Sequence, residues 1–382
     1  MNVLFVQQQP CIRALKYARG FKDLKLDINI VFCYTGKTFS GIYGQGDEMV
    51  DEWIRLDNDP ATTLQETVER YQIRLIHCHN APDSLTNLCI DLFKGRVPVV
   101  HDIHDLMSAR NTVYEDGVEN GLSTRNWKQE EKRAIEKSDA VIAVSDEIFS
   151  QARQLSYRIA DNSHVYPNYI PTRFVPDHGN VWEPNGLDRP VRIVYEGFVS
   201  ATKDSHYYFV DIFKELAGTG LEVHIYPSRE NKIYKDLAKS NKLIYCHDSL
   251  PPEKLFMELP KYDLGWCGFN DKVNTRHMDT VLPNKFFEYI ACGLPVISFP
   301  HKSLKEIIEK RGLGIVVESA LQTVEGIQMA DWSHIRQQVG NAKYDFTVES
   351  NIPDIIALYN KLTDKRMTAE PSMDATGLAC PV

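Results

Sequence analysis

The chain has 382 residues, a length that favours two domains over a single compact core. Its composition, 43% hydrophobic and 25% charged, is typical of a folded globular protein. Lys and Arg number 43 against 52 Asp and Glu, giving a net charge of −9, and this acidic balance argues against a nucleic-acid-binding protein.

The cysteines are scattered, and no two have the Cys-x-x-Cys spacing of a zinc site. Several lie in apolar runs such as LIHCH and LGWCGF, which is typical of buried thiols in a reducing compartment. The first residues lack a signal-peptide pattern, and no apolar run approaches the ~20 residues that span a bilayer. We therefore expect a cytoplasmic protein, at most peripheral to a membrane.

Up to residue 169, short apolar runs rich in Val and Ile alternate with amphipathic stretches. The runs predicted as strands are Val3–Val6, Ile28–Cys33, Ile73–His77, Val97–Asp102 and Ala140–Val144. The stretches predicted as helices are Cys11–Lys22, Thr62–Tyr71, Ser84–Phe93, Arg125–Lys137 and Glu147–Leu155. Strands that are apolar on both faces belong to parallel sheets covered by helices, so this half predicts a doubly wound sheet.

Residues 171–190 are rich in proline and glycine, which predicts a linker after an N-terminal domain of residues 1–170. The alternation then restarts through residues 191–345. Strands are predicted at Val191–Tyr195, Glu222–Tyr226, Leu243–Cys246, Leu264–Cys267 and Pro295–Phe299. Helices are predicted at Tyr207–Leu216, Lys232–Ser240, Pro252–Leu259 and Pro283–Cys292.

The two halves therefore predict similar α/β domains in tandem, with a cleft between them. Because open parallel sheets bind ligands at the carboxyl ends of their strands, such a cleft would hold a donor and an acceptor. A final helix at residues 346–363 is expected to pack back on the N-terminal domain. Residues 364–382 lack periodicity and are expected to be disordered.

The segment DTVLPNKFFEYIACGLPVISFP carries the most chemical information. Pro283 suits the first turn of a helix, whose free N–H groups, together with Asn284 and Lys285, would favour a diphosphate in the cleft. Glu288 lies one turn further along on the same face, where a carboxylate can accept two hydrogen bonds from a ribose diol. On spacing alone, the alternative is an ordinary surface Glu288 beside a solvated Lys285.

This segment resembles the signature of family 4 glycosyltransferases with the GT-B fold, P-x-K-x-x-E-Y-x-A-x-G-x-P-V-I. Further segments between about residues 70 and 320 resemble the same family: IHCHNAPDSLTNL, PVVHDIHDL, EEKRAIEKSDAVIAVSDEI, VYPNYI, YEGFVSATKD and YDLGWCGF. The resemblance implies a GT-B architecture, in which two tandem Rossmann-like, doubly wound domains face each other across a cleft.

The resemblance also implies which residues bind the nucleotide. Glu288 would hold the ribose hydroxyls, with Asn284 and Lys285 beside the diphosphate. Gly197, in the segment that resembles the start of the nucleotide-binding domain, would also lie beside the nucleotide. The backbone of the loop from His247 to Leu250 would contact the base.

For the reacting groups, the resemblance implies that Lys203 neutralises the donor diphosphate and that His104, followed by Asp105, lies beside the reacting sugar. A strand-end His104 that is merely hydrogen-bonded by Asp105 is the alternative. The resemblance also implies retention at the anomeric carbon. Transfer would be independent of metal, because fixed cations and helix N–H groups can stabilise the departing nucleoside diphosphate.

The chain departs from the family pattern at several positions. Thr280 stands where the family often has a glutamate, and Phe198 stands where it commonly has an arginine after the glycine. We expect Arg229 or Lys285 to supply the missing cation. The loop QQQPCIR lacks the usual glycines, which leaves the acceptor contacts open.

The resulting prediction is a glycosyltransferase that uses a UDP- or GDP-linked sugar and acts on a glycan or lipid-linked acceptor. A GT-B nucleotide-binding scaffold with little or no activity and a sugar-nucleotide epimerase are the alternatives. The basic helix at residues 11–22 could touch anionic lipid, with a solvated helix face as its alternative. We predict no metal site at Asp57–Asp59 or among the histidines at 77, 79, 101 and 104.

Overall fold

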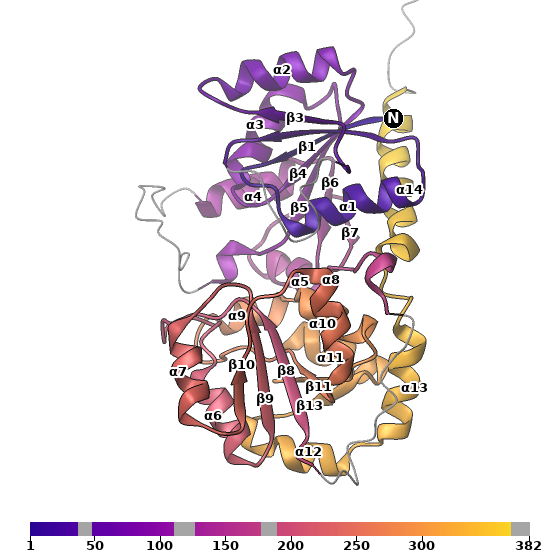
Figure 1. Cartoon of the computed structure of the whole chain (residues 1–382). Coiled ribbons are helices and arrows are strands. Elements are labelled where there is room, and N and C mark those ends of the chain that lie inside the picture. The colour runs from indigo at the N-terminus through magenta and orange to yellow at the C-terminus, as the bar shows by residue number, and fades with distance from the viewer. Residues whose placement is uncertain (37–47, 111–126, 177–188, 368–382) are drawn as a thin grey trace, which may run out of the picture.

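The computed structural model describes residues 1–36, 48–110, 127–176 and 189–367. Within these ranges the chain forms two α/β domains stacked on each other, each built on a parallel sheet with helices on both faces (Figure 1). The predicted doubly wound architecture is therefore confirmed.

The N-terminal sheet has the strand order β3-β2-β1-β4-β5-β6-β7 among the described residues. Its strands are β1 (Asn2–Gln7), β2 (Asn29–Tyr34), β3 (Glu52–Arg55), β4 (Leu75–His79), β5 (Val99–Ile103), β6 (Ala140–Ala143) and β7 (His164–Val165). Its helices are α1 (Ile12–Asp23), α2 (Pro60–Arg70), α3 (Asp83–Phe93), α4 (Trp127–Lys137) and α5 (Asp146–Gln154). The central strands are buried on both faces, as expected for a covered parallel sheet.

The C-terminal sheet has the order β10-β9-β8-β11-β12-β13. Its strands are β8 (Arg192–Gly197), β9 (Glu222–Pro227), β10 (Ile244–Cys246), β11 (Leu264–Trp266), β12 (Val296–Ser298) and β13 (Gly314–Val316). Its helices are α6 (Val210–Gly218), α7 (Lys232–Ser240), α8 (Pro252–Glu258), α9 (Thr275–Thr280), α10 (Asn284–Ala291), α11 (Lys302–Arg311), α12 (Thr323–Met329) and α13 (Trp332–Ala342).

The sequence did not predict the helices α9, α11, α12 and α13, and the strands that it did not predict lie at sheet edges. β3 and β7 lie at opposite edges of the N-terminal sheet, and β13 lies at an edge of the C-terminal sheet. Edge strands need not be apolar on both faces, so they lack the continuous apolar run that identified the central strands. The predicted helix at 125–137 is described from Trp127 onward, and Arg125 lies outside the described residues.

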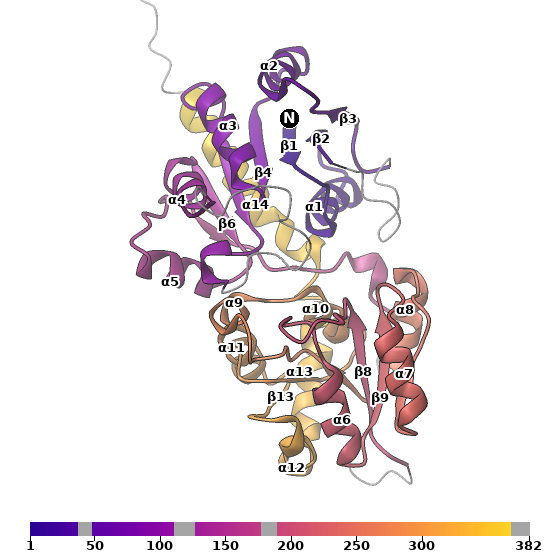
Figure 2. The same cartoon turned by 90° about the vertical axis from the view of Figure 1, so that its left-hand side faces the viewer.

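The last helix, α14 (Val348–Met367), leaves the C-terminal domain and runs along the N-terminal domain (Figures 1 and 2). Val348, Ile352 and Tyr359 are fully buried in the core between α14, α1 and the N-terminal sheet. Gly20 allows this close approach, because an added Cβ would lie 2.4 Å from Val348. The helix continues to Met367, beyond the predicted end at 363, and the remainder of the predicted tail lies outside the described residues.

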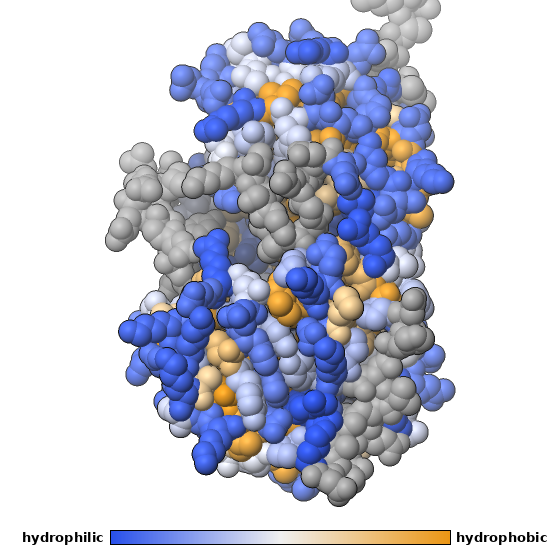
Figure 3. Space-filling model, in the orientation of Figure 1, coloured by the Kyte–Doolittle hydropathy of each residue, from blue (hydrophilic) through white to orange (hydrophobic). Residues whose placement is uncertain are grey.

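Hydrophilic residues cover most of the face seen in Figure 3, and apolar residues occur there in small, separate groups. Among the helices that the structure describes, none is long and apolar enough to cross a membrane.

Both sheets reverse their strand order beside a central strand, at β1/β4 and at β8/β11. Parallel sheets bind ligands outside the carboxyl ends of the strands at such a reversal. The residues that follow β1, β5 and β8 border the same cavity, so the two reversal points face one space between the domains.

Candidate active site

A cavity of about 720 Å³ lies between the two domains. The N-terminal domain contributes to its lining Cys11, Arg13, His104, Asp105 and Asn168. The C-terminal domain contributes, among others, Glu196, Gly197, Phe198, Ser249, Leu250, Phe269, Asn284, Lys285 and Glu288. The structure therefore brings most of the predicted site residues to one space.

Helix α10 presents its first turn to this cavity. Pro283 is the N-cap residue and provides no side-chain cap, and Asn284, Lys285 and Glu288 all line the cavity. The helix lies close to the sheet because Gly265 has no side chain: an added Cβ would lie 2.3 Å from the ring of Tyr289. The Tyr289 hydroxyl in turn accepts a 2.9 Å hydrogen bond from the backbone N–H of Glu196, which ties α10 to the end of β8.

Lys285 is buried between aromatic rings. Its Nζ donates to the Tyr195 hydroxyl at 3.2 Å and lies 4.4 Å from the centre of that ring and 5.2 Å from that of Phe269. Burial lowers the pKa of Lys285, although the Glu196 carboxyl acts in the opposite direction. Gly197 adopts a φ of +117° beside it, a backbone conformation that favours glycine.

Glu196 is a cavity residue that the sequence analysis did not single out. Glu196 and Glu288 are 8% and 7% exposed, and both line the cavity. Burial and the neighbouring Glu288 raise the pKa of Glu196 well above its ordinary value. A polar residue at the end of a buried strand, just before a glycine, was the signal available in the sequence.

Lys16 was also missed as a site residue. It belongs to α1 in the N-terminal domain, and its Nζ donates to Asn284 Oδ1 at 2.7 Å and to the Asn168 carbonyl at 3.3 Å. Burial lowers the pKa of Lys16 to about 8, although Glu288 opposes this shift. A cation of one domain therefore holds the first residue of the helix that carries the site in the other domain.

Helix α1 turns half of its basic residues into the protein, so it does not present the continuous basic face considered for contact with lipid or solvent. Arg13 and Lys16 are buried, as are Tyr17 and Phe21. The guanidinium of Arg13 contacts both carboxylate oxygens of Asp102, because a buried cation needs a paired anion.

His104 lies on the N-terminal side of the cavity. Its Nδ1 lies 3.7 Å from the Cys11 sulfur and its Nε2 lies 3.2 Å from His79 Nδ1. Burial lowers the pKa of His104, but Cys11 and Asp102 act in the opposite direction and the net shift is upward. The same contact with His104 helps to give Cys11 a lowered pKa despite burial, which raises it.

The alternative hypothesis, in which Asp105 hydrogen-bonds the imidazole of His104, does not describe the contacts of Asp105 in the structure. Its carboxylate pairs with Arg110 at 3.2 Å and faces His277 of the C-terminal domain at 3.7 Å. The neighbours of His104 are instead the thiol of Cys11 and the ring of His79. Burial would raise the pKa of Asp105, but His277 and Arg110 produce a net lowering.

Three predicted residues do not line the cavity. Lys203 and Arg229 are exposed on the loops after β8 and β9. The loop that carries Lys203 is closed by a hydrogen bond from Ser200 N–H to the Tyr207 carbonyl. His247 lies 3.0 Å from the His224 ring nitrogen and stacks on Tyr226, while Leu250 of the same loop does reach the cavity.

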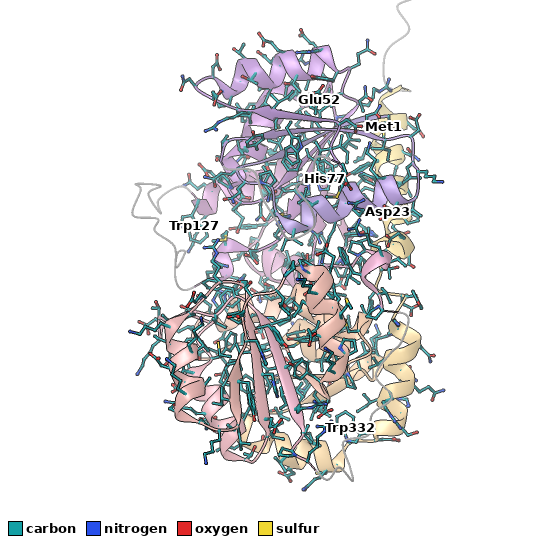
Figure 4. The ribbon with its side chains drawn as sticks, viewed as in Figure 1. Met1, Asp23, Glu52, His77, Trp127 and Trp332 are labelled. Atoms are coloured by element: carbon teal, nitrogen blue, oxygen red, sulfur yellow. The ribbon has the colours of Figure 1, made fainter. Side chains whose placement is uncertain are left out.

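Within the part of the chain that the structure describes, His77, His79 and Asp102 have ligand atoms close enough together to hold a metal ion. They lie inside the N-terminal domain, where Figure 4 labels His77. The Arg13 guanidinium already bonds both oxygens of Asp102, so its positive charge opposes a metal ion there.

Two family models match the chain, one in each domain. Residues 45–174 match the model described as Glycosyltransferase Family 4. Residues 211–347 match the model described as Glucosyltransferase 3-like, C-terminal domain. A search of curated protein sequences gives no match.

Solved structures resemble the whole chain. Sucrose-phosphate synthase from Thermosynechococcus elongatus is 14% identical, with 95% of this chain and 99% of that chain covered and a TM-score of 0.68. HepE from Anabaena, solved in complex with UDP-glucose, is 13% identical, with coverage of 96% and 100% and a TM-score of 0.65. A glycosyltransferase from Rickettsia africae is 13% identical, with coverage of 94% and 98% and a TM-score of 0.64. At these identities the likeness establishes the fold.

Proposed function

We propose that this chain, which has the GT-B fold, is a family 4-like glycosyltransferase that transfers a sugar from a nucleoside diphosphate sugar to a glycan or glycolipid acceptor. One observation carries the proposal: Asn284, Lys285 and Glu288 lie on one turn of α10 and face the cavity between the domains. A helix N-terminus with an adjacent ammonium group attracts a diphosphate, and a carboxylate one turn away suits the pentose diol.

In this arrangement the donor lies mainly on the C-terminal domain. The diphosphate meets the first turn of α10 and Lys285, the pentose meets Glu288, and the base lies against the loop that ends at Leu250. HepE was solved with UDP-glucose, which supports a uridine nucleotide as the first donor to test; a guanosine nucleotide is the second.

The barrier to transfer falls when the negative charge that grows on the departing diphosphate meets fixed positive groups. Lys285 and the α10 N–H groups supply this stabilisation. Lys203 remains in the proposal as a second cation, because its loop follows Gly197 and Phe198, which line the cavity. Phe198 and the ring of Tyr207 pack edge to face, 5.3 Å apart, where an arginine would be expected from the family pattern.

We further propose retention at the anomeric carbon, with the donor phosphate accepting the acceptor's proton. His104 then positions or stabilises the reacting groups. Its raised pKa keeps a larger share of the imidazole protonated near neutral pH, where it favours negative charge in the cavity. Asp105, which is paired with Arg110, lines the cavity beside His104.

A two-step experiment tests this function. Thermal shifts with uridine, guanosine and adenosine diphosphates identify the base, since a ligand that binds only the folded state raises the melting temperature. The matching nucleotide sugars are then assayed for hydrolysis and transfer. We expect both; binding without turnover would indicate a scaffold, and donor isomerisation would indicate an epimerase.

Removal of divalent metal provides a separate prediction. Because the proposed stabilising charges belong to the protein, EDTA treatment followed by assay in metal-free buffer should leave the transfer rate unchanged within about twofold. A loss of activity that returns on adding Mg²⁺ or Mn²⁺ would contradict the metal-independent mechanism.

A further inference from the structure

Glu196 lies at the carboxyl end of β8 and faces the cavity beside Glu288. Its backbone N–H donates to the Tyr289 hydroxyl at 2.9 Å, so α10 fixes the position of this residue. Both residues are more than nine-tenths buried and line the same cavity, and the neighbouring carboxyl of Glu288 helps to raise the pKa of Glu196. Two ionised carboxylates placed side by side in a buried site would repel each other, so one of the two holds a proton.

The charged and titratable groups around this pair come from both domains. They are Lys285 on α10, Lys16 on α1, Cys267 after β11, and the hydroxyls of Tyr195 and Tyr289. Lys16 is engaged by Asn284 and the Asn168 carbonyl, and Lys285 lies over the ring of Tyr195. A donor diphosphate that pairs with Lys285 would reduce the positive charge available to stabilise ionised Glu196 and Glu288.

We propose that Glu196 is a positioning residue for the donor, which shares one proton with Glu288 and so holds that carboxyl in place to accept the pentose diol. This inference rests on the proposed function. A carboxylate has about four lone-pair positions, so Glu288 has room to accept the Glu196 proton and both diol hydroxyls at once. A single acid then both receives the diol and is held in place by its neighbour.

Proton uptake on donor binding follows from this arrangement. The bound nucleotide removes the remaining water from the pair and brings negative phosphates near it, and both changes disfavour two ionised carboxylates. At a pH where the empty pair has lost its shared proton, Glu196 must therefore recover one from solvent as the donor binds. Affinity for the diol should then fall about tenfold for each pH unit, the slope expected for uptake of one proton.

The test compares two probes, a nucleoside diphosphate and its 2′,3′-dideoxy analogue, using the base selected by the thermal-shift panel. Both carry the diphosphate, so titration of Lys285, His104 or the phosphate itself affects both. The affinity of the nucleoside diphosphate divided by that of the dideoxy analogue, measured between pH 5.5 and 9.5, reports only the contribution of the diol to binding. We expect the ratio to be constant at low pH and to fall about tenfold per pH unit above the point where the shared proton is lost.

Glu196→Gln should make this ratio independent of pH while keeping most of the low-pH affinity, because the amide imitates the protonated carboxyl. Glu196→Ala should lower the ratio at every pH. Glu222→Gln, at the opposite end of the neighbouring strand β9, is the matched control and should retain the wild-type profile. A merely structural Glu196 would change the melting temperature in these variants without flattening the profile.

Calorimetry of the wild-type protein keeps the test independent of variant folding. In buffers of different ionisation enthalpy at alkaline pH, the natural nucleotide should take up more protons than the dideoxy analogue. Equal uptake, or a ratio that does not change with pH, overturns the role of Glu196 and leaves the proposed function standing. Failure of the wild type to bind any nucleoside diphosphate overturns both.

Discussion

At the scale of single residues, the sequence predicted the members of the site that lie on one helix. Asn284, Lys285 and Glu288 could be found because helical spacing alone places them on one face. Glu196 and Lys16 could not, since their approach to α10 depends on how strands and domains pack. One part of the site therefore follows from the spacing of residues along one helix. The other part depends on contacts between elements that are far apart in the sequence.

Glu288→Ala tests the residue assigned to the pentose. Losing two hydrogen bonds to a charged group, at about 1.5 kcal/mol each, should weaken nucleotide binding about 10²-fold. Isothermal calorimetry measures the loss, and the exposed Glu309→Ala on α11 is the control. Unchanged affinity in a folded Glu288→Ala protein would remove Glu288 from the site.

Lys203→Ala tests the cation that lies outside the cavity lining. If Lys203 meets the diphosphate during transfer, its loss should lower kcat by about 10²-fold, the size seen when one stabilising group is removed from a developing charge. Lys214→Ala, on the exposed face of α6, should have no effect. Turnover near the wild-type rate would show that Lys285 and α10 suffice.

At the scale of elements, the contact between β11 and α10 decides where the site lies. The sequence predicted both elements but not the reason they approach so closely, which is the missing side chain at Gly265 under the Tyr289 ring. The docking of α14 has the same character. Its helical pattern could be read from the sequence, whereas the fit of Val348 against Gly20 is a property of the folded pair.

Gly265→Ala should therefore damage both stability and binding. An added Cβ would overlap the Tyr289 ring, and overpacking of this kind costs about 1–3 kcal/mol. Chemical denaturation should register that loss, and nucleotide affinity should fall as α10 is displaced. Gly218→Ala at the end of α6 meets open space and should leave both quantities nearly unchanged or slightly improved. Wild-type behaviour of Gly265→Ala would refute the proposed tight contact.

At the scale of the whole molecule, several contacts join the two domains. Lys16 reaches Asn284, Ser145 donates to the Thr280 carbonyl at 2.6 Å, and α14 packs on the N-terminal sheet. The alternation of strands and helices predicted two doubly wound domains, because periodicity reports burial. The same alternation could not predict which loops lie opposite each other across the cavity, because that depends on how the two domains pack.

The many buried histidines predict how the whole molecule responds to acid. Burial lowers the pKa of His101 to about 3 and those of His277 and His301 to about 4. In the unfolded chain they titrate near 6.5, so between about pH 6.5 and 4 the unfolded state binds more protons and stability falls as the pH falls. Each such histidine contributes a slope of up to about 1.4 kcal/mol per pH unit.

Melting temperatures measured from pH 7.5 to 4.5 test this expectation. The decline should begin below about pH 6.5, above the range in which ordinary carboxylates take up protons. His301→Gln should reduce the slope in that interval relative to the wild type. A melting temperature that stays constant down to pH 5 would contradict the description of these imidazoles as neutral and buried.

The most direct test is a crystal structure of the protein with the nucleoside diphosphate that it binds most tightly. We expect pyrophosphate oxygens against the backbone amides of Asn284 and Lys285, with the hydroxyls of the nucleoside sugar bound by Glu288. Density for the nucleotide anywhere else on the molecule, or with Glu288 out of reach of the diol, would contradict this expectation.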